Sequence, residues 1–185
     1  MTTLDLLPGD SARPLGPLST VAKNAVLSEC GTFRYFLTRV WNTQLPLMVF
    51  LMLNPSTADA EVDDPTIRRC MGFARRDGYG GIIVVNLFSF RSPSPAAMKE
   101  IEDPIGPDNE LWLQRAFTYA LYAKADAVAA WGVDGRHRDR DYEVVKMAES
   151  IGLELKCLGK TKGGDPRHPL YVKGDQPLVT LRDEP

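Results

Sequence analysis

The sequence predicts an α/β fold in which a mostly parallel sheet is covered by helices on both faces, as a three-layer sandwich preceded by a β-hairpin. Two observations indicate this class. Residues 47–53 and 82–85 are short, almost wholly apolar runs, as expected of strands buried on both faces of a parallel sheet. Segments with helix-capping signals separate such runs, and strands that alternate with helices are typical of this architecture.

The first part of the chain predicts an irregular arm and then the hairpin. Residues 1–18 contain three prolines and two glycines, so we expect an arm ahead of a single α/β domain that spans residues 19–185. Residues 25–28 and 32–41 are rich in β-forming side chains. The Glu29-Cys30-Gly31 turn between them predicts that they pair as a hairpin.

The remaining elements alternate along the chain. Asp64 followed by Pro65 is a good helix start, with Asp as the N-cap and Pro in the first turn, and the helix is expected to end near Gly78. Further helices are predicted at 109–124, capped by Asp108, and at 142–151, with a helical turn at 96–100; further strands are predicted at 127–131 and 153–158.

Composition excludes several classes of function. The net charge of −2 gives no support for nucleic-acid binding through bulk charge, so such a site would need a local basic patch. No apolar run approaches the ~20 residues of a membrane helix. The three cysteines are far apart and lack a CxxC spacing, which predicts reduced thiols in the cytoplasm and neither a metal site nor a cofactor.

Two asparagines stand at the ends of the two most apolar strands. Asn54 follows the run at 47–53, and Asn86 follows the run at 82–85. In an open α/β sheet, ligands bind just beyond the carboxyl ends of the strands. We therefore expect both amides to contribute to one pocket, together with Pro55, Ser56 and Thr57 directly after Asn54.

The chain resembles two families. The strings LNPSTAD, DDPTIRR, GYGGIIVVNLFSFR, AAWG and LGKTKGGDPRHPLY, between Ala25 and Val172, are similar to the family known as domain of unknown function 1643. That resemblance implies membership and no established activity. A more remote resemblance, to the uracil-DNA glycosylase superfamily, comes from the order of three short motifs that contain Asn54-Pro55, Asn86 and His168-Pro169.

The remote resemblance implies a role for each motif. In that superfamily one Asn positions the attacking water, a second Asn reads the edge of the base, and a His acts on the base carbonyl as the bond breaks. Carried over to this chain, these roles fall on Asn54, Asn86 and His168. The resemblance therefore implies a protein that binds a nucleobase or nucleotide and hydrolyses an N-glycosidic bond.

Other residues could complete this chemistry. A general base is needed to take a proton from water, and Asp59, with Asp63 and Asp64 as alternatives, follows Asn54 closely enough. Phe88 could stack on a base, and Arg91 could bind a phosphate.

A structural or non-catalytic interpretation also remains open for these residues. Asn54 and Asn86 could simply cap the backbone where strands turn into loops. Met52, Ser56 and Leu170 stand where the glycosylases carry smaller residues, which favours a non-catalytic module that binds a modified base, a nucleotide or a protein partner. A third hypothesis is hydrolysis of a small nucleotide-like metabolite.

Overall fold

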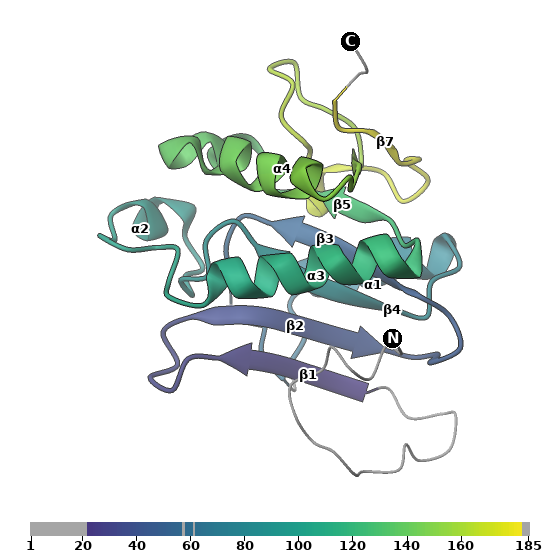
Figure 1. Cartoon of the computed structure of the whole chain (residues 1–185), viewed down its shortest axis with the longest axis horizontal. Coiled ribbons are helices and arrows are strands. Elements are labelled where there is room, and N and C mark those ends of the chain that lie inside the picture. The colour runs from purple at the N-terminus through teal and green to yellow at the C-terminus, as the bar shows by residue number, and fades with distance from the viewer. Residues whose placement is uncertain (1–21, 57, 61, 183–185) are drawn as a thin grey trace.

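A seven-stranded sheet forms the middle layer of the computed structural model, which describes residues 22–56, 58–60 and 62–182. The strand order is β1-β2-β4-β3-β5-β6-β7 (Figure 1). The strands are β1 (Ala22–Leu27), β2 (Arg34–Val40), β3 (Leu47–Met52), β4 (Gly81–Asn86), β5 (Ala127–Ala129), β6 (Leu155–Cys157) and β7 (Val179–Thr180). The helices are α1 (Pro65–Arg76), α2 (Pro95–Lys99), α3 (Asn109–Ala123) and α4 (Arg140–Ser150), with 3-10 turns η2 (Val133–Asp139) and η3 (Pro169–Tyr171).

The centre of the sheet is parallel. β3 pairs in parallel with β4 on one side and with β5 on the other, so that Phe50 lies opposite both Val84 and Val128. β6 continues the parallel run beyond β5. Every residue of β3 and β4 is buried, which is why both strands are apolar except for Asn86 at the end of β4 and were recognisable in the sequence.

The sheet as a whole is mixed, so the prediction of a mostly parallel sheet is wrong. The predicted hairpin exists as β1 and β2, but it extends the sheet, because β2 pairs antiparallel with β4 through Leu37 opposite Val84. β7 adds a further antiparallel strand next to β6. Local sequence patterns give the strands of a hairpin but not the strand that it joins. The arm predicted at residues 1–18 lies outside the described residues.

Helices cover both faces of the sheet. α1 packs on one face through Ile67, Met71 and Phe73, and α3 and α4 pack on the other (Figure 1). The predicted helix start is confirmed, because the Asp64 carboxylate accepts a hydrogen bond from the Ile67 N–H at 2.8 Å. No helix of the described part of the chain is long and apolar enough to cross a membrane.

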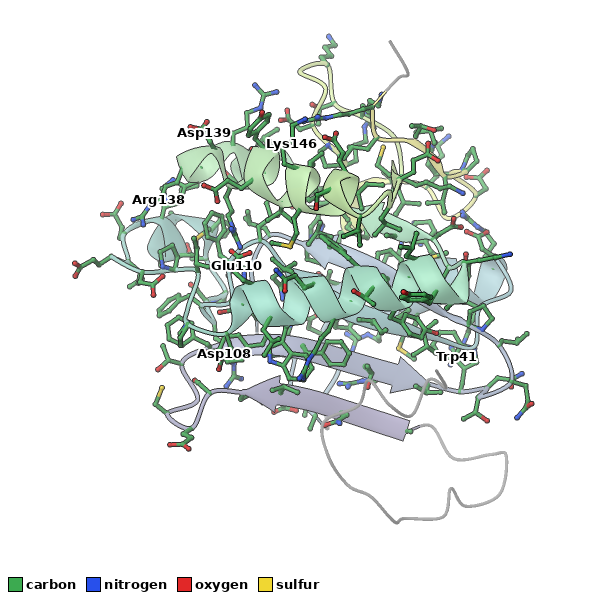
Figure 2. The ribbon with its side chains drawn as sticks, in the orientation of Figure 1. Trp41, Asp108, Glu110, Arg138, Asp139 and Lys146 are labelled. Atoms are coloured by element: carbon green, nitrogen blue, oxygen red, sulfur yellow. The ribbon has the colours of Figure 1, made fainter. Side chains whose placement is uncertain are left out.

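An ion pair joins the two helices that share a face. Glu110 near the start of α3 lies toward α4 (Figure 2), and its carboxylate contacts the Arg140 guanidinium at 2.6 Å. Arg140 is buried and also donates from Nε to the Leu87 carbonyl at 3.0 Å. This arginine therefore ties α3 and α4 to the chain that follows β4.

The chain leaves two neighbouring strands toward opposite faces. After β3 it continues into α1 on one face, and after β5 it continues through η2 into α4 on the other. Because β3 and β5 are adjacent, their carboxyl ends form a topological switch point, where open α/β sheets leave a crevice.

At the amino ends of β3 and β5, two tyrosine hydroxyls accept hydrogen bonds from the backbone. The Leu47 N–H, at the start of β3, donates to the Tyr119 hydroxyl of α3 at 2.8 Å. The Asp126 N–H, just before β5, donates to the Tyr79 hydroxyl at 3.0 Å. Each hydroxyl satisfies a backbone donor at the point where a strand begins.

We predict that Tyr119→Phe lowers the free energy of unfolding by about 1–3 kcal/mol, because the buried Leu47 N–H then loses its acceptor. Urea unfolding measures the change. Tyr122→Phe on the same helix is the matched control, since Tyr122 is 73% exposed. Equal effects of the two substitutions would contradict the assignment.

Candidate functional site

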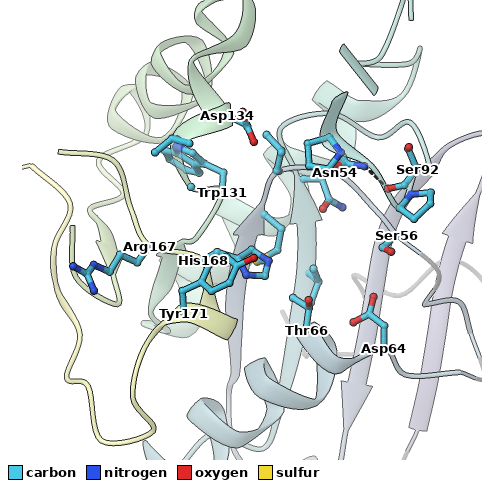
Figure 3. A pocket seen from close by; sticks show the side chains of 18 of the residues that line it. Asn54, Ser56, Asp64, Thr66, Ser92, Trp131, Asp134, Arg167, His168 and Tyr171 are labelled. Atoms are coloured by element: carbon cyan, nitrogen blue, oxygen red, sulfur yellow. Dashed lines mark hydrogen bonds between the residues drawn. The ribbon is translucent and has the colours of Figure 1, made fainter. Parts of the chain in front are cut away.

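A cavity of about 590 Å³ opens at the switch point. Residues that follow β3 and β5 form two of its sides, and the start of α1 and the segment around η3 form the others (Figure 3). Asn54, Asn86 and His168 all line this one cavity. The structure therefore brings together the three residues that the sequence placed in different motifs.

Asn54 ties together two loops at the cavity. Its Nδ2 donates to the Ser92 carbonyl at 2.8 Å (Figure 3) and to its neighbouring Pro55 carbonyl at 3.1 Å. The Ser92 N–H in turn donates to the Pro55 carbonyl at 2.8 Å. These bonds fix the amide plane, so that the nitrogen serves the loops and only the oxygen, Oδ1, is left for a water or a ligand.

Asn86 presents an amide with no partner. The residue is 1% exposed, and neither Nδ2 nor Oδ1 has a hydrogen-bond partner among the described residues. Its backbone is held from α3, because Asn109 Nδ2 donates to the carbonyls of Asn86 and Leu87 at 3.2 and 2.9 Å. Leaving buried polar atoms unpaired costs about 1–3 kcal/mol, so an amide of this kind beside a cavity needs an explanation.

His168 caps η3 and faces the cavity with its ring held in place. Its Nδ1 accepts a hydrogen bond from the Leu170 N–H at 3.3 Å, which leaves the proton of the neutral ring on Nε2. Burial lowers the pKa of His168 below its ordinary value, and the charge of Asp64 opposes this in part. Arg69 of α1 donates to the carbonyls of Pro169 and Val172 and so fixes the η3 segment on the helix.

Only some of the other predicted site residues reach the cavity. Ser56 lines it, whereas Thr57 lies outside the described residues. Pro55 is buried and contributes its carbonyl to the loop bonds. Phe88 does not line the cavity. It is fully buried in the core, where the centroid of its ring lies 5.7 Å from that of the His137 ring.

Of the charged candidates, Asp59 and Arg91 lie away from the cavity, and Asp64 lines it. The Asp59 carboxylate accepts a hydrogen bond from the Val62 N–H at 2.8 Å and does not line the cavity. Asp64 does line it, held by its bond to the Ile67 N–H at 2.8 Å. Arg91 donates from Nη1 to the Gly31 carbonyl at 3.2 Å, on the hairpin turn, and does not line the cavity.

The cavity includes residues that the sequence did not single out for function, and Trp131 and Arg34 are two of them. Trp131 belongs to the core, as expected, and also lines the cavity; its buried Nε1 has no partner among the described residues. Gly135 lies against the indole, since a Cβ there would come within 2.1 Å of Trp131 Cδ1. Arg34 is 2% exposed and also lines the cavity. In the sequence, Arg34 and Arg39 are both charged residues in a strand whose other members are mostly apolar. This pattern therefore indicated two arginines and did not distinguish Arg34.

Residues 34–170 match the family DUF1643, described as proteins of unknown function. The chain belongs to this family. The matched segment contains Arg34, Asn54, Asn86 and His168, so the cavity is built almost wholly from it. Comparisons with curated proteins and with solved structures find no match.

Several side chains of this DUF1643 cavity can form hydrogen bonds with a polar organic ligand. The amide of Asn86, the carboxylate of Asp64 and the Nε2–H of His168 supply acceptors and donors. The described residues contain no group of three or more His, Cys, Asp and Glu side chains that could hold a metal ion.

We predict that His168 titrates below pH 6.5, because burial disfavours the charged ring. Because the folded pKa lies below the unfolded value of about 6.5, the contribution of His168 to the stability of the protein is fully present above about pH 6.5. It is lost as the pH falls from there through the lower pKa of the folded state. NMR titration of the ring protons measures the pKa, and His168→Gln assigns the signal against His137, the other histidine of the chain. A pKa at or above 6.5 would contradict the burial of the ring.

Proposed function

We propose that the cavity binds a nucleobase or nucleotide through the side chain of Asn86. The observation that carries the proposal is the buried amide whose donor and acceptor both lack partners in the part of the chain that the structure describes. Each base presents adjacent donors and acceptors on its edges, and a planar amide can pair with such an edge through two hydrogen bonds. A bound base would thus supply both partners that Asn86 lacks.

The size and walls of the cavity support a base-sized ligand. Its volume of about 590 Å³ lies within the range of small-molecule sites, which is about 300–1,000 Å³. Trp131 and Tyr171 line it with aromatic rings, and Tyr171 contacts the ring of His168 at 5.6 Å. These rings can provide the stacking that the sequence assigned to Phe88, because aromatic faces stack on bases with little sequence preference.

We predict that Asn86→Leu abolishes binding of the four nucleosides, measured by calorimetry, while the unliganded protein becomes as stable as the wild type or more so. The reason is that leucine has a similar volume and removes two unpaired polar atoms.

Asn109→Leu is the matched control. Asn109 is fully buried and uses its Nδ2 for two backbone carbonyls, so its loss is expected to destabilise the protein. If Asn86→Leu destabilises the protein as Asn109→Leu does and nucleoside binding persists, Asn86 is a structural residue.

A second candidate function is hydrolysis of an N-glycosidic bond. Two observations favour it: the Asp64 carboxylate lines the same cavity as Asn86, and so does the neutral His168 with its proton on Nε2. Asp64 would accept a proton from a water held at Asn54 Oδ1. The water oxygen would then bond to the sugar carbon as the bond to the base nitrogen breaks. The His168 Nε2–H would stabilise the charge on the departing base.

We predict that Asp64→Asn lowers base release by about 10²–10⁴-fold with nucleoside affinity unchanged, since asparagine still caps α1 but cannot accept the proton. Release is measured by chromatography on nucleosides, nucleotides and uracil-containing DNA. Asp59→Asn, away from the cavity, is the control and keeps full activity. Wild-type protein that binds nucleosides but releases no base from any of these substrates would identify a non-catalytic binding module.

A further inference from the structure

Arg34 places a buried positive charge at the cavity with most of its donors unused. The residue is 2% exposed and lies at the start of β2. Among the described residues its guanidinium donates one hydrogen bond, from Nη1 to the Ala58 carbonyl. Within the same residues the buried Nε has no partner, and no carboxylate forms an ion pair with the side chain. A guanidinium has five N–H donors, so this one is largely unsatisfied.

Arg39, five residues further along the same strand, has a full set of hydrogen-bond partners and serves as a comparison. Its Nε pairs with the Asp63 carboxylate at 2.6 Å, and its terminal nitrogens donate to carbonyls that include those of Thr38 and Asp59. Arg39 does not line the cavity, whereas Arg34 does. Of these two arginines, the one with incomplete pairing is the one that lines the cavity.

The surroundings of Arg34 suit an anion. The hydroxyls of Ser56 and Thr66 line the same cavity, beside the start of the twelve-residue helix α1 (Figure 3). A helix N-terminus carries partial positive charge and favours an anion. Asp64 is the carboxylate at this corner, and one of its oxygens already accepts the Ile67 N–H.

Burial without a counter-ion is unfavourable for a charged group. It lowers the pKa of Arg34 to about 10, even though the charge of Asp64 opposes the shift. The side chain is still protonated at neutral pH, so the charge persists in the cavity. An anionic ligand would offset the cost of burying this charge, because it would accept hydrogen bonds from the unpaired N–H groups. Guanidinium groups bind phosphate through paired hydrogen bonds.

We propose that the ligand of this cavity carries a phosphate group and that Arg34 is its counter-ion. The inference rests on the proposed function, because it assigns a second group of the same ligand: Asn86 binds the base, and Arg34 binds the phosphate. It moves the phosphate contact from Arg91, which the sequence suggested, to an arginine that lines the cavity.

Two other places for the phosphate can be tested directly. Arg91 resembles Arg34 in having a buried Nε without a partner, but it does not line the cavity, so Arg91→Gln is the matched control. Lys162 lines the cavity and is exposed, so Lys162→Gln tests a phosphate site at an exposed part of the cavity.

The experiment compares the affinities of adenosine, cytidine, guanosine and uridine with those of their 5′-monophosphates, by calorimetry on the full chain. We expect the wild type to bind at least one monophosphate about tenfold or more tightly than its nucleoside, as charge-assisted hydrogen bonds require. Arg34→Gln should lose this preference and keep the nucleoside affinity, which also shows that the variant is folded. Arg34→Lys keeps the positive charge but lacks the paired N–H donors of the guanidinium, so it should retain part of the preference for the monophosphate.

The outcomes separate this inference from the proposed function. If no nucleoside and no monophosphate binds, the proposed function fails. If nucleosides bind without a preference for monophosphates, or if Lys162→Gln or Arg91→Gln removes the preference and Arg34→Gln does not, the assignment of Arg34 is overturned and the base site stands. A single-stranded oligonucleotide that binds more tightly than the monophosphate, with a steep salt dependence, would place the phosphate in a nucleic-acid strand.

Discussion

The parallel pairing of β3 with both of its neighbours is the constraint on which the cavity depends. β3 is buried on both faces and lies between β4 and β5 in the sheet. Parallel strands need crossover connections, and here α1 crosses on one face while α3 and α4 lie on the other. The chain must therefore diverge after β3 and after β5, and the divergence leaves an opening that no backbone segment fills.

The loops around that opening are held by side-chain bonds to backbone carbonyls. Asn54 joins the segment after β3 to the segment after β4 through the Ser92 carbonyl. Arg69 fixes the segment of His168 to α1 through the Val172 carbonyl. A site whose walls are fixed in this way costs little ordering on binding, which is the advantage of preorganisation. The unpaired groups that point to a ligand, on Asn86 and Arg34, lie within this fixed frame.

Much of the fold was predictable because its signals are local. The Asp64-Pro65 start of α1 depends on a cap and a proline within one turn of helix, and the apolar runs of β3 and β4 reflect burial on both faces. Asn54 and Asn86 could be placed at the cavity for a related reason: polar residues that end buried parallel strands reach the same edge of the sheet. The sequence by itself therefore determined the core elements and placed Asn54, Ser56 and Asn86 at the cavity, and the remote resemblance added His168.

Tertiary structure alone decided which other residues belong to the cavity. Phe88 and Trp131 are both aromatic residues that follow buried strands, yet only Trp131 reaches the cavity, and Arg34 reaches it where Arg91 does not. The docking of the β1–β2 hairpin on β4 made the difference for Arg34, because it brings the start of β2 beside the end of β4. Such contacts join residues more than forty positions apart in the chain, and no local pattern of side chains encodes which strand edge a hairpin will pair with.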